Sequence, residues 1–368
     1  WCIGNEMYGP WQLGHMPLSQ YWVKHNYIVE AMKKVDPNIK VTVSGASVAE
    51  KSLGGAEKKN EFFPDIWAPL VQEKLPYEFG SLNDWDGWML EKCADNTDYL
   101  SEHTYAYPDL AFDAEKQQFV DVQDPLQFRT RRMANRIGEA FEAWQKYLEK
   151  MPSLKEKNIK FIFDEWGIRN RSADGKSHPP TGMVGPLSYA LFLHEMFRNS
   201  SMVAASCPTG GLFTVLVDNT NQTVGFSGEG LVMKLMANHF TNALPVEVSG
   251  NSPQQPVRGT VMVDMGSKPT GSATYPLDVL AAVSSDKKKF LASFVNPTEE
   301  AQEFSLQIAG VKLATMGKLY QIAAASMDAV NEPDKKPAVE ILEYPQKTLM
   351  GQVQVPPISV NVYEFTIE

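Results

Sequence analysis

The chain has 368 residues, a formal net charge of −10 at pH 7, and 43% hydrophobic and 11% aromatic residues. This length suggests two domains, and the composition excludes a disordered chain and supports a sizeable core. The acidic balance argues against nucleic acid and against an anionic membrane surface as partners, since both recruit basic residues, but a neutral sugar remains compatible. No apolar run reaches the roughly 18 residues of a transmembrane helix. The three cysteines lie far apart and lack metal-ligand spacing.

Short apolar strands alternate with amphipathic helices up to about Pro245. The predicted strands are Trp1–Asn5, Ile39–Gly45, Tyr99–Tyr105, Ile159–Trp166 and Met202–Ser206. The predicted helices are Ser19–Val35, Gly87–Ala94, Pro125–Lys150, Pro186–Arg198 and Gly228–Phe240. The segment from Ala46 to about Asp84 is rich in Gly, Lys and Pro and is expected to be a loop. This alternation predicts a parallel sheet with right-handed crossovers, whose chemistry lies at the C-terminal ends of its strands.

From about Gly250 the predicted helices stop, and short strands separated by turn clusters follow. The predicted strands are Val279–Val283, Lys289–Val295, Glu303–Ile308 and Val353–Ile367. This pattern is typical of an antiparallel β-sandwich. We therefore expect two domains, residues 1–250 and residues 251–368.

Two glutamates, Glu6 and Glu165, end predicted strands of the same sheet within apolar and aromatic sequence. Cleavage of a glycosidic bond requires two carboxyl groups, one protonated and one ionised, and a retaining enzyme holds them about 5–5.5 Å apart. We expect the pKa of Glu6 to be raised by burial and by the charge of Glu165, so that Glu6 keeps its proton near neutral pH. The ordinary alternative is a solvated charge at each strand end.

Further polar and aromatic side chains lie beside these glutamates in the sequence. Asn5 precedes Glu6 and could bind a sugar hydroxyl, although a turn role is equally open. His103 and Tyr105 share one face of their strand and could point into the same cavity, or they could be core residues. Trp11 and Trp166 could stack on a sugar ring or pack in the core.

The motifs around these residues resemble those of one enzyme family. Residues 4–15 resemble the acid/base motif of glycoside hydrolase family 51, the α-L-arabinofuranosidases, except that Tyr8 stands where the family usually has Asp. Residues 102–105 look like the family's His-x-Tyr strand, and residues 163–167 resemble its nucleophile motif. Similarity extends to residues 31–40 and to the C-terminal end, so the resemblance covers essentially the whole chain.

The resemblance implies a fold and roles for the site residues. The fold would be a (β/α)8 TIM barrel, of which this chain holds strands four to eight, followed by a jelly-roll-like β-sandwich. Glu6 would be the general acid/base and Glu165 the nucleophile. Asn5 would bind the sugar 2-hydroxyl, with His103 and Tyr105 lining the site. No metal or organic cofactor is expected.

The function implied is that of a retaining, exo-acting hydrolase. It would release terminal α-L-arabinofuranosyl residues from arabinose-containing plant polysaccharides or oligosaccharides by double displacement. Two alternatives remain open: an endo-acting β-glucanase or xylanase with the same two glutamates, and a non-catalytic carbohydrate-binding or assembly component. A secreted, periplasmic or cytoplasmic location is equally compatible with the sequence.

The missing early barrel strands imply a partner. By the resemblance, the chain starts where about three strands and their helices should already have passed. We therefore expect another polypeptide to complete the fold, either the N-terminal part of the same gene product or a second copy.

Overall fold

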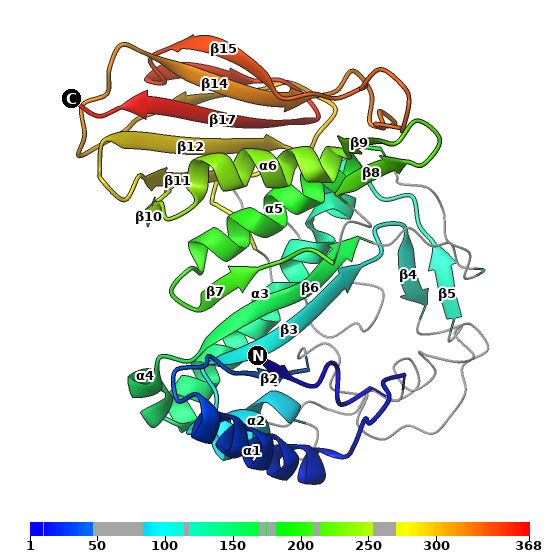
Figure 1. Ribbon diagram of the computed structural model, residues 1–368. Helices are drawn as coiled ribbons and strands as arrows, with labels where there is room; N and C mark the ends of the chain where they lie inside the picture. Colours follow the sequence, from blue (N-terminus) through cyan, green and yellow to red (C-terminus); the bar gives the residue numbers. More distant parts are fainter. Residues whose placement is uncertain are drawn as a thin grey trace.

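The computed structural model describes most of the chain, as two large sheets with helices (Figure 1). The described residues are 1–9, 11–46, 84–113, 118–168, 174, 182–209, 214–252 and 270–368. The predicted loop between Ala46 and Asp84 lies outside them, apart from its two end residues. Helices α5 and α6 lie between the parallel sheet and the larger antiparallel sheet in Figure 1.

The parallel sheet has five strands in the order β1–β2–β3–β6–β7. These strands are β1 (Cys2–Ile3), β2 (Thr42–Ser44), β3 (Tyr99–Ala106), β6 (Lys160–Ile168) and β7 (Val203–Ser206). Every neighbouring pair is parallel, which confirms the parallel sheet predicted from strand–helix alternation. Strand β1 is shorter than predicted, because the backbone turns away at Gly4, with φ of 89°, and at Glu6, with φ of 44°.

Helices follow the strands of this sheet along the chain. They are α1 (Leu18–Val35), α2 (Trp85–Cys93), α3 (Leu126–Lys150), α4 (Ser153–Lys157), α5 (Val184–Arg198) and α6 (Gly228–Phe240). Phe161 of β6 packs on Trp144 of α3, with ring centroids 4.8 Å apart, and Ile3 of β1 clusters with Val29 of α1. No helix among the described residues is long and apolar enough to cross a membrane.

The second region is antiparallel. Its main sheet has the order β10–β11–β12–β17–β14–β15, and a smaller sheet pairs β13 with β16. Two further antiparallel pairs, β4 with β5 and β8 with β9, come from the first region of the chain. The strands are β4 (Leu110–Asp113), β5 (Gln118–Asp121), β8 (Val215–Asp218), β9 (Thr223–Phe226), β10 (Leu244–Val246), β11 (Asp278–Val283), β12 (Lys289–Asn296), β13 (Gln302–Leu306), β14 (Met316–Ala323), β15 (Leu342–Lys347), β16 (Gly351–Val355) and β17 (Ser359–Thr366). Phe294 of β12 and Phe304 of β13 have ring centroids 5.2 Å apart, so the β13–β16 pair packs on the main sheet.

Two differences from the predicted strands have physical causes. The predicted strand Val353–Ile367 is two strands, because Pro356 and Pro357 supply no backbone N–H for a sheet ladder. Strands β14 and β15 were not predicted. Strand β15 is mostly exposed and contains Pro345, which is typical of an edge strand and gives little apolar signal.

A buried charge cluster joins the two regions. Asp278 of β11 is 0% exposed and accepts hydrogen bonds from Arg131 of α3 at 3.0 Å and Arg198 of α5 at 2.9 Å. His194 of α5 places Nδ1 2.8 Å from Asp278 and Nε2 2.7 Å from the hydroxyl of Ser293 on β12. Burial alone raises the pKa of Asp278, but the two arginines and His194 outweigh burial and hold that pKa well below its usual value. The cluster therefore holds an ionised aspartate between the helices and the antiparallel sheet.

Candidate active site

An irregularity in β6 determines which side chains face the site. Ser101 of β3 pairs with Ile162 of β6, but His103 pairs with Glu165, so two steps on β3 match three on β6. The extra residue of such a β-bulge breaks strict alternation and re-aims side chains. Asp164 and Glu165 consequently both reach the same histidine of β3.

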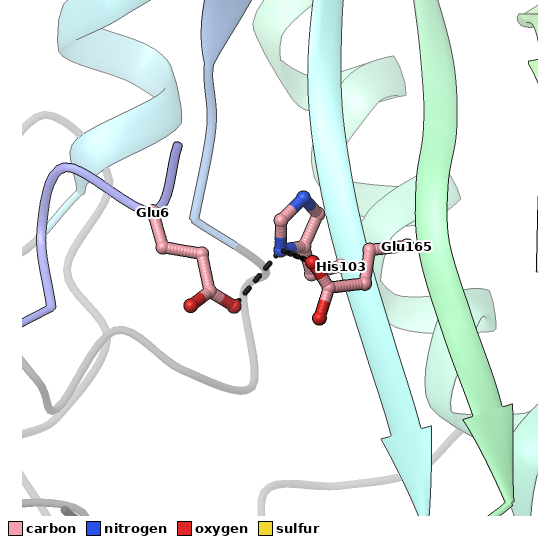
Figure 2. Close-up of side chains that lie close together, drawn as sticks. All are labelled: Glu6, His103 and Glu165. Carbon is pink, nitrogen blue, oxygen red and sulfur yellow. Dashed lines mark hydrogen bonds and ion pairs between the residues drawn. The ribbon is translucent and has the colours of Figure 1, made fainter. Parts of the chain in front are cut away.

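His103 lies between the two predicted catalytic glutamates (Figure 2). Its Nδ1 atom is 2.8 Å from Oε1 of Glu6 and 3.4 Å from Oε2 of Glu165. Its Nε2 atom is 3.5 Å from Oδ1 of Asp164. Glu6 comes from the turn after β1, His103 from β3, and the two acidic residues from β6. The fold therefore gathers four side chains from three separate chain segments.

Glu6 is held by three donors. Besides the contact with His103, its Oε2 atom accepts hydrogen bonds from Nε1 of Trp11 and from Nε2 of Gln12, the latter at 3.2 Å. Burial alone raises the pKa of Glu6, but these hydrogen bonds, with that of His103 the largest, outweigh burial and lower its pKa. The predicted raised pKa of Glu6 is therefore wrong for this state, because the sequence did not show how many donors converge on the carboxylate.

The His103 ring is cationic in this arrangement. Burial alone lowers its pKa, but the hydrogen bonds to Asp164 and Glu6 and the charges of Glu165 and Glu6 outweigh burial and raise the pKa to about 10. The ring is only 5% exposed, so water screens these charges little. In the free protein the proton shared with Glu6 therefore resides on His103.

Glu165 is positioned from the opposite side by a tyrosine. The Tyr105 hydroxyl donates a hydrogen bond to Oε1 of Glu165 and lies 2.6 Å from Oγ1 of Thr209, just beyond β7. Thr209 in turn lies 3.2 Å from the backbone carbonyl of Trp166, to which its hydroxyl donates. Tyr105 is 3% exposed, so its ring is fixed by packing as well as by these contacts.

The remaining predicted site residues lie in different surroundings. Asn5 is exposed next to Glu6. Trp11 is half-buried, and its edge packs against Tyr8 with centroids 5.9 Å apart, so Tyr8 orients the indole that bonds to Glu6. The prediction that Trp166 binds the sugar is wrong. It is 0% exposed and packs on Tyr189 and Phe192 of α5, with centroids 4.6 Å apart, so it offers no face to a sugar.

Four residues of the site were not predicted as site residues, and Asp164, which contacts His103, is one of them. Gln12 bonds to Glu6, Ser101 donates to Oδ1 of Asp164 at 2.7 Å, and Thr209 contacts Tyr105. Ser101 shares the strand face of His103 and Tyr105 at spacing two, a signal that could have identified it. Gln12 and Thr209 lie in turns, where no periodicity indicates which way a side chain points.

The central three residues also have the donor set of a metal site. One ligand atom from each of Glu6, His103 and Glu165 lies within 4.8 Å of the other two. The Nδ1 atom of His103, however, already bridges both carboxylates, and a protonated ring nitrogen has no lone pair for a metal. The geometry favours a pair of carboxylates sharing a histidine cation.

The chain is similar in sequence to known arabinofuranosidases. No family model matches the chain. The chain is 25% identical over 180 residues to an exo-α-(1→6)-L-arabinofuranosidase of Bifidobacterium longum, covering 49% of this chain and 28% of that protein. It is 27% identical over 199 residues to an intracellular exo-α-(1→5)-L-arabinofuranosidase of Acetivibrio thermocellus, covering 53% of this chain and 32% of that protein.

A solved structure matches almost the whole chain. The family 51 α-L-arabinofuranosidase of Thermotoga petrophila superposes with a TM-score of 0.72 at 19% identity, covering 99% of this chain and 65% of that one. The resemblance to glycoside hydrolase family 51 is confirmed. At this identity the superposition shows a shared fold. The match to each of the two curated relatives spans less than a third of that relative's length.

Proposed function

We propose that the chain carries the catalytic pair of a retaining glycoside hydrolase that releases terminal α-L-arabinofuranosyl residues. The observation that supports this most is the separation of the two glutamates, since an oxygen of Glu6 and an oxygen of Glu165 lie within 4.8 Å. Retaining enzymes hold their carboxyl groups about 5–5.5 Å apart, whereas inverting enzymes need about 6.5–9.5 Å to admit a water. The closeness of Glu6 and Glu165 therefore favours the retaining reaction over the inverting one.

Each glutamate has a distinct role in the proposed reaction. Glu165 attacks the anomeric carbon while Glu6 donates a proton to the leaving oxygen, and Glu6 then deprotonates the water that releases the sugar. Glu6 is ionised in the free protein, so it must first receive a proton. His103 holds one 2.8 Å away. Transfer from Nδ1 to Oε1 leaves a neutral imidazole and a carboxylic acid.

The proposed sugar specificity is based on the activities named for the relatives. Both curated relatives are named exo-acting α-L-arabinofuranosidases, and the solved neighbour is an α-L-arabinofuranosidase. The exposed Asn5 and the half-buried Trp11 flank Glu6 and are the proposed contacts for the sugar and its leaving group. The substrate would be an arabinose-containing plant oligosaccharide or polysaccharide.

The proposed architecture is part of a barrel followed by a sandwich. The five parallel strands follow chain order across the sheet, as consecutive strands of a (β/α)8 barrel do. We assign them to barrel strands four to eight, within residues 1–250, and residues 251–368 to a jelly-roll-like sandwich. Supporting this, the family 51 neighbour superposes on 99% of the chain.

We expect another polypeptide to pair with the two edge strands of the parallel sheet. Among the described residues, β1 pairs only with β2, and β7 pairs only with β6. Trp1 beside the first edge is 74% exposed, and an apolar hollow of about 440 Å³ lies against the second, lined by Met196, Val203 and Phe240 among others. Each buried backbone group left unpaired costs about 1–3 kcal/mol. The proposed partner is the N-terminal part of the same gene product or a second copy, supplying strands to these edges.

The partner is tested by size. Gel filtration with light scattering should detect this chain in a complex or an oligomer, with backbone amides of β1 and β7 protected from hydrogen exchange. A stable monomer of 41.1 kDa that hydrolyses arabinofuranosides would contradict the proposal.

The activity is tested on the protein with any co-purifying polypeptide. It should hydrolyse an aryl α-L-arabinofuranoside, and Glu165→Ala should abolish turnover. Glu6→Ala should slow poor leaving groups by about 10²–10⁴-fold and good ones far less, because only poor ones need the proton. Azide should restore turnover to at least one of these variants. The exposed Glu299→Ala serves as the matched control. Hydrolysis of internal β-linkages instead would favour an endo-acting enzyme, and no difference between Glu165→Ala and the protein itself would refute catalysis.

A further inference from the structure

The His103 ring faces a carboxylate at each nitrogen. Nδ1 lies 2.8 Å from Glu6 and 3.4 Å from Glu165, and Nε2 lies 3.5 Å from Asp164. A neutral imidazole carries one N–H and one lone pair, so one nitrogen would turn its lone pair toward an anion. Only the doubly protonated ring offers a donor in both directions. The geometry therefore favours an imidazolium as long as the acceptor at Nε2 stays in place.

Asp164 is that acceptor, and it is itself fixed. Its Oδ1 atom accepts a hydrogen bond from the Ser101 hydroxyl at 2.7 Å. Ser101 is 3% exposed and lies two residues before His103 on the same strand, so it faces the same side. The β-bulge opposite this stretch lets Asp164 reach the ring without displacing Glu165.

The charge of Asp164 also acts on two thiol groups near the sheet. After the larger effect of burial, its charge raises the pKa of the thiols of Cys2, on β1, and Cys207, just after β7. Cys2 lies on one edge strand of the five-stranded sheet, and Cys207 follows the other edge strand. The charged groups found against the ring are Glu6 from the β1 turn and Asp164 and Glu165 from β6.

We propose that Asp164 is a positioning residue that, through Nε2 of His103, keeps the ring doubly protonated with its Nδ1 proton between Glu6 and Glu165. The Nδ1 proton is then available for transfer to Oε1 of Glu6, and the positive charge stays on the histidine until a substrate requires the acid. This role rests on the proposed function, since a stored proton matters only where Glu6 acts as an acid. Asp164 itself touches neither substrate nor reacting atoms.

The test observes the ring directly and does not depend on turnover. Nitrogen-15 NMR of the full chain, with His103→Gln to assign the signal, reports whether each ring nitrogen carries a proton. In the wild-type chain both nitrogens should stay protonated at neutral pH. In Asp164→Asn, which keeps the shape and removes the charge, the His103 titration should move down by about one pH unit or more. Asp328→Asn, an exposed aspartate elsewhere, should leave the titration unchanged.

A second variant keeps the proposal testable if Asp164→Asn does not fold. Ser101→Ala keeps the Asp164 charge but releases its orientation, so it should shift the His103 titration in the same direction by less. Circular dichroism checks that each variant is folded. An unchanged His103 titration in Asp164→Asn, or in Ser101→Ala if Asp164→Asn does not fold, overturns the proposal.

Kinetics separate this proposal from the proposed function. If the protein hydrolyses arabinofuranosides, Asp164→Asn should move the pH profile of kcat while KM changes little. If no hydrolysis occurs but the His103 titration falls as expected, the positioning role stands and the proposed function fails. A normal titration together with normal hydrolysis refutes the positioning role alone.

Discussion

Nδ1 of His103 and Oε1 of Glu6 lie 2.8 Å apart, and His103 is only 5% exposed. This contact ties stability to pH in a definite direction. The pKa of His103 rises from 6.5 to about 10 in the folded chain, so its contribution to stability is fully present below pH 6.5 and is lost as the pH rises through about 10. We expect the gap in free energy of unfolding between the protein and His103→Gln to shrink across this range. Urea titrations at several pH values measure it, and a constant gap would contradict the ion pair.

Glu6 owes its lowered pKa partly to Trp11. Replacing Trp11 with Phe removes the indole N–H that bonds to Glu6 and keeps an aromatic ring at that position. The pKa of Glu6 should therefore rise, while the free energy of unfolding changes by less than about 1 kcal/mol because Trp11 is half-buried. Carbon-13 NMR of the Glu6 carboxyl gives the pKa. Trp22→Phe, another half-buried tryptophan, is the control and should leave that pKa alone.

Tyr105 should matter for rate more than for folding. Tyr105→Phe removes the hydroxyl that donates to Glu165, a hydrogen bond to a charged group worth about 1.5–3 kcal/mol. If the protein is the proposed hydrolase, kcat/KM should fall by about 10–100-fold, which corresponds to that energy. Tyr363→Phe, a buried tyrosine of β17, should leave kcat/KM unchanged. Equal effects of the two substitutions would mean that the Tyr105 hydroxyl does not act on Glu165.

Trp166 should behave as a core residue. Trp166→Ala leaves a cavity beside Tyr189 and Phe192 and should cost about 3–5 kcal/mol in free energy of unfolding. Affinity for arabinose, measured by calorimetry on the folded fraction, should stay the same. Loss of sugar affinity without loss of stability would instead support the stacking role suggested by the sequence.

The Asp278 cluster should carry a large share of stability. Asp278→Asn leaves Arg131 without the carboxylate it contacts, and Arg198 with Glu195 alone, and should cost about 3–5 kcal/mol. Because the pKa of Asp278 is lowered, its contribution is present above pH 3.8 and is lost as the pH falls through the folded value. Thermal unfolding of Asp278→Asn beside the exposed Asp36→Asn measures the effect. Equal melting temperatures would show that the arginines find other partners.

The sequence predicted the parallel sheet because its strands are apolar and end in polar residues. Glu6, His103, Tyr105 and Glu165 stood at those ends, and the structure brings them together. Trp166 could not be placed, because the face it occupies depends on the bulge between Ile162 and Glu165. No periodicity in a single strand reveals a register shift against its neighbour.

Long-range polar contacts were also beyond the sequence. Arg131 and Asp278 are 147 residues apart, and each is an ordinary charged residue until the fold buries both. The lowered pKa of Glu6 depends on Trp11 and Gln12, which approach it through a turn. Side chains in turns follow no repeating direction, so the sequence alone could not place Trp11 and Gln12 beside Glu6.

The Asp278 cluster has a consequence for how the chain can be divided. Helices α3 and α5 each supply an arginine, but the aspartate that neutralises them comes from β11, far along the chain. A fragment ending at residue 250 would keep both cations but lose Asp278, so the buried Arg131 would lose the carboxylate it contacts and Arg198 would keep Glu195 alone. The antiparallel sheet is therefore no exchangeable module, and a chimera that replaces it must either carry an acid at the position of Asp278 or neutralise the two arginines together.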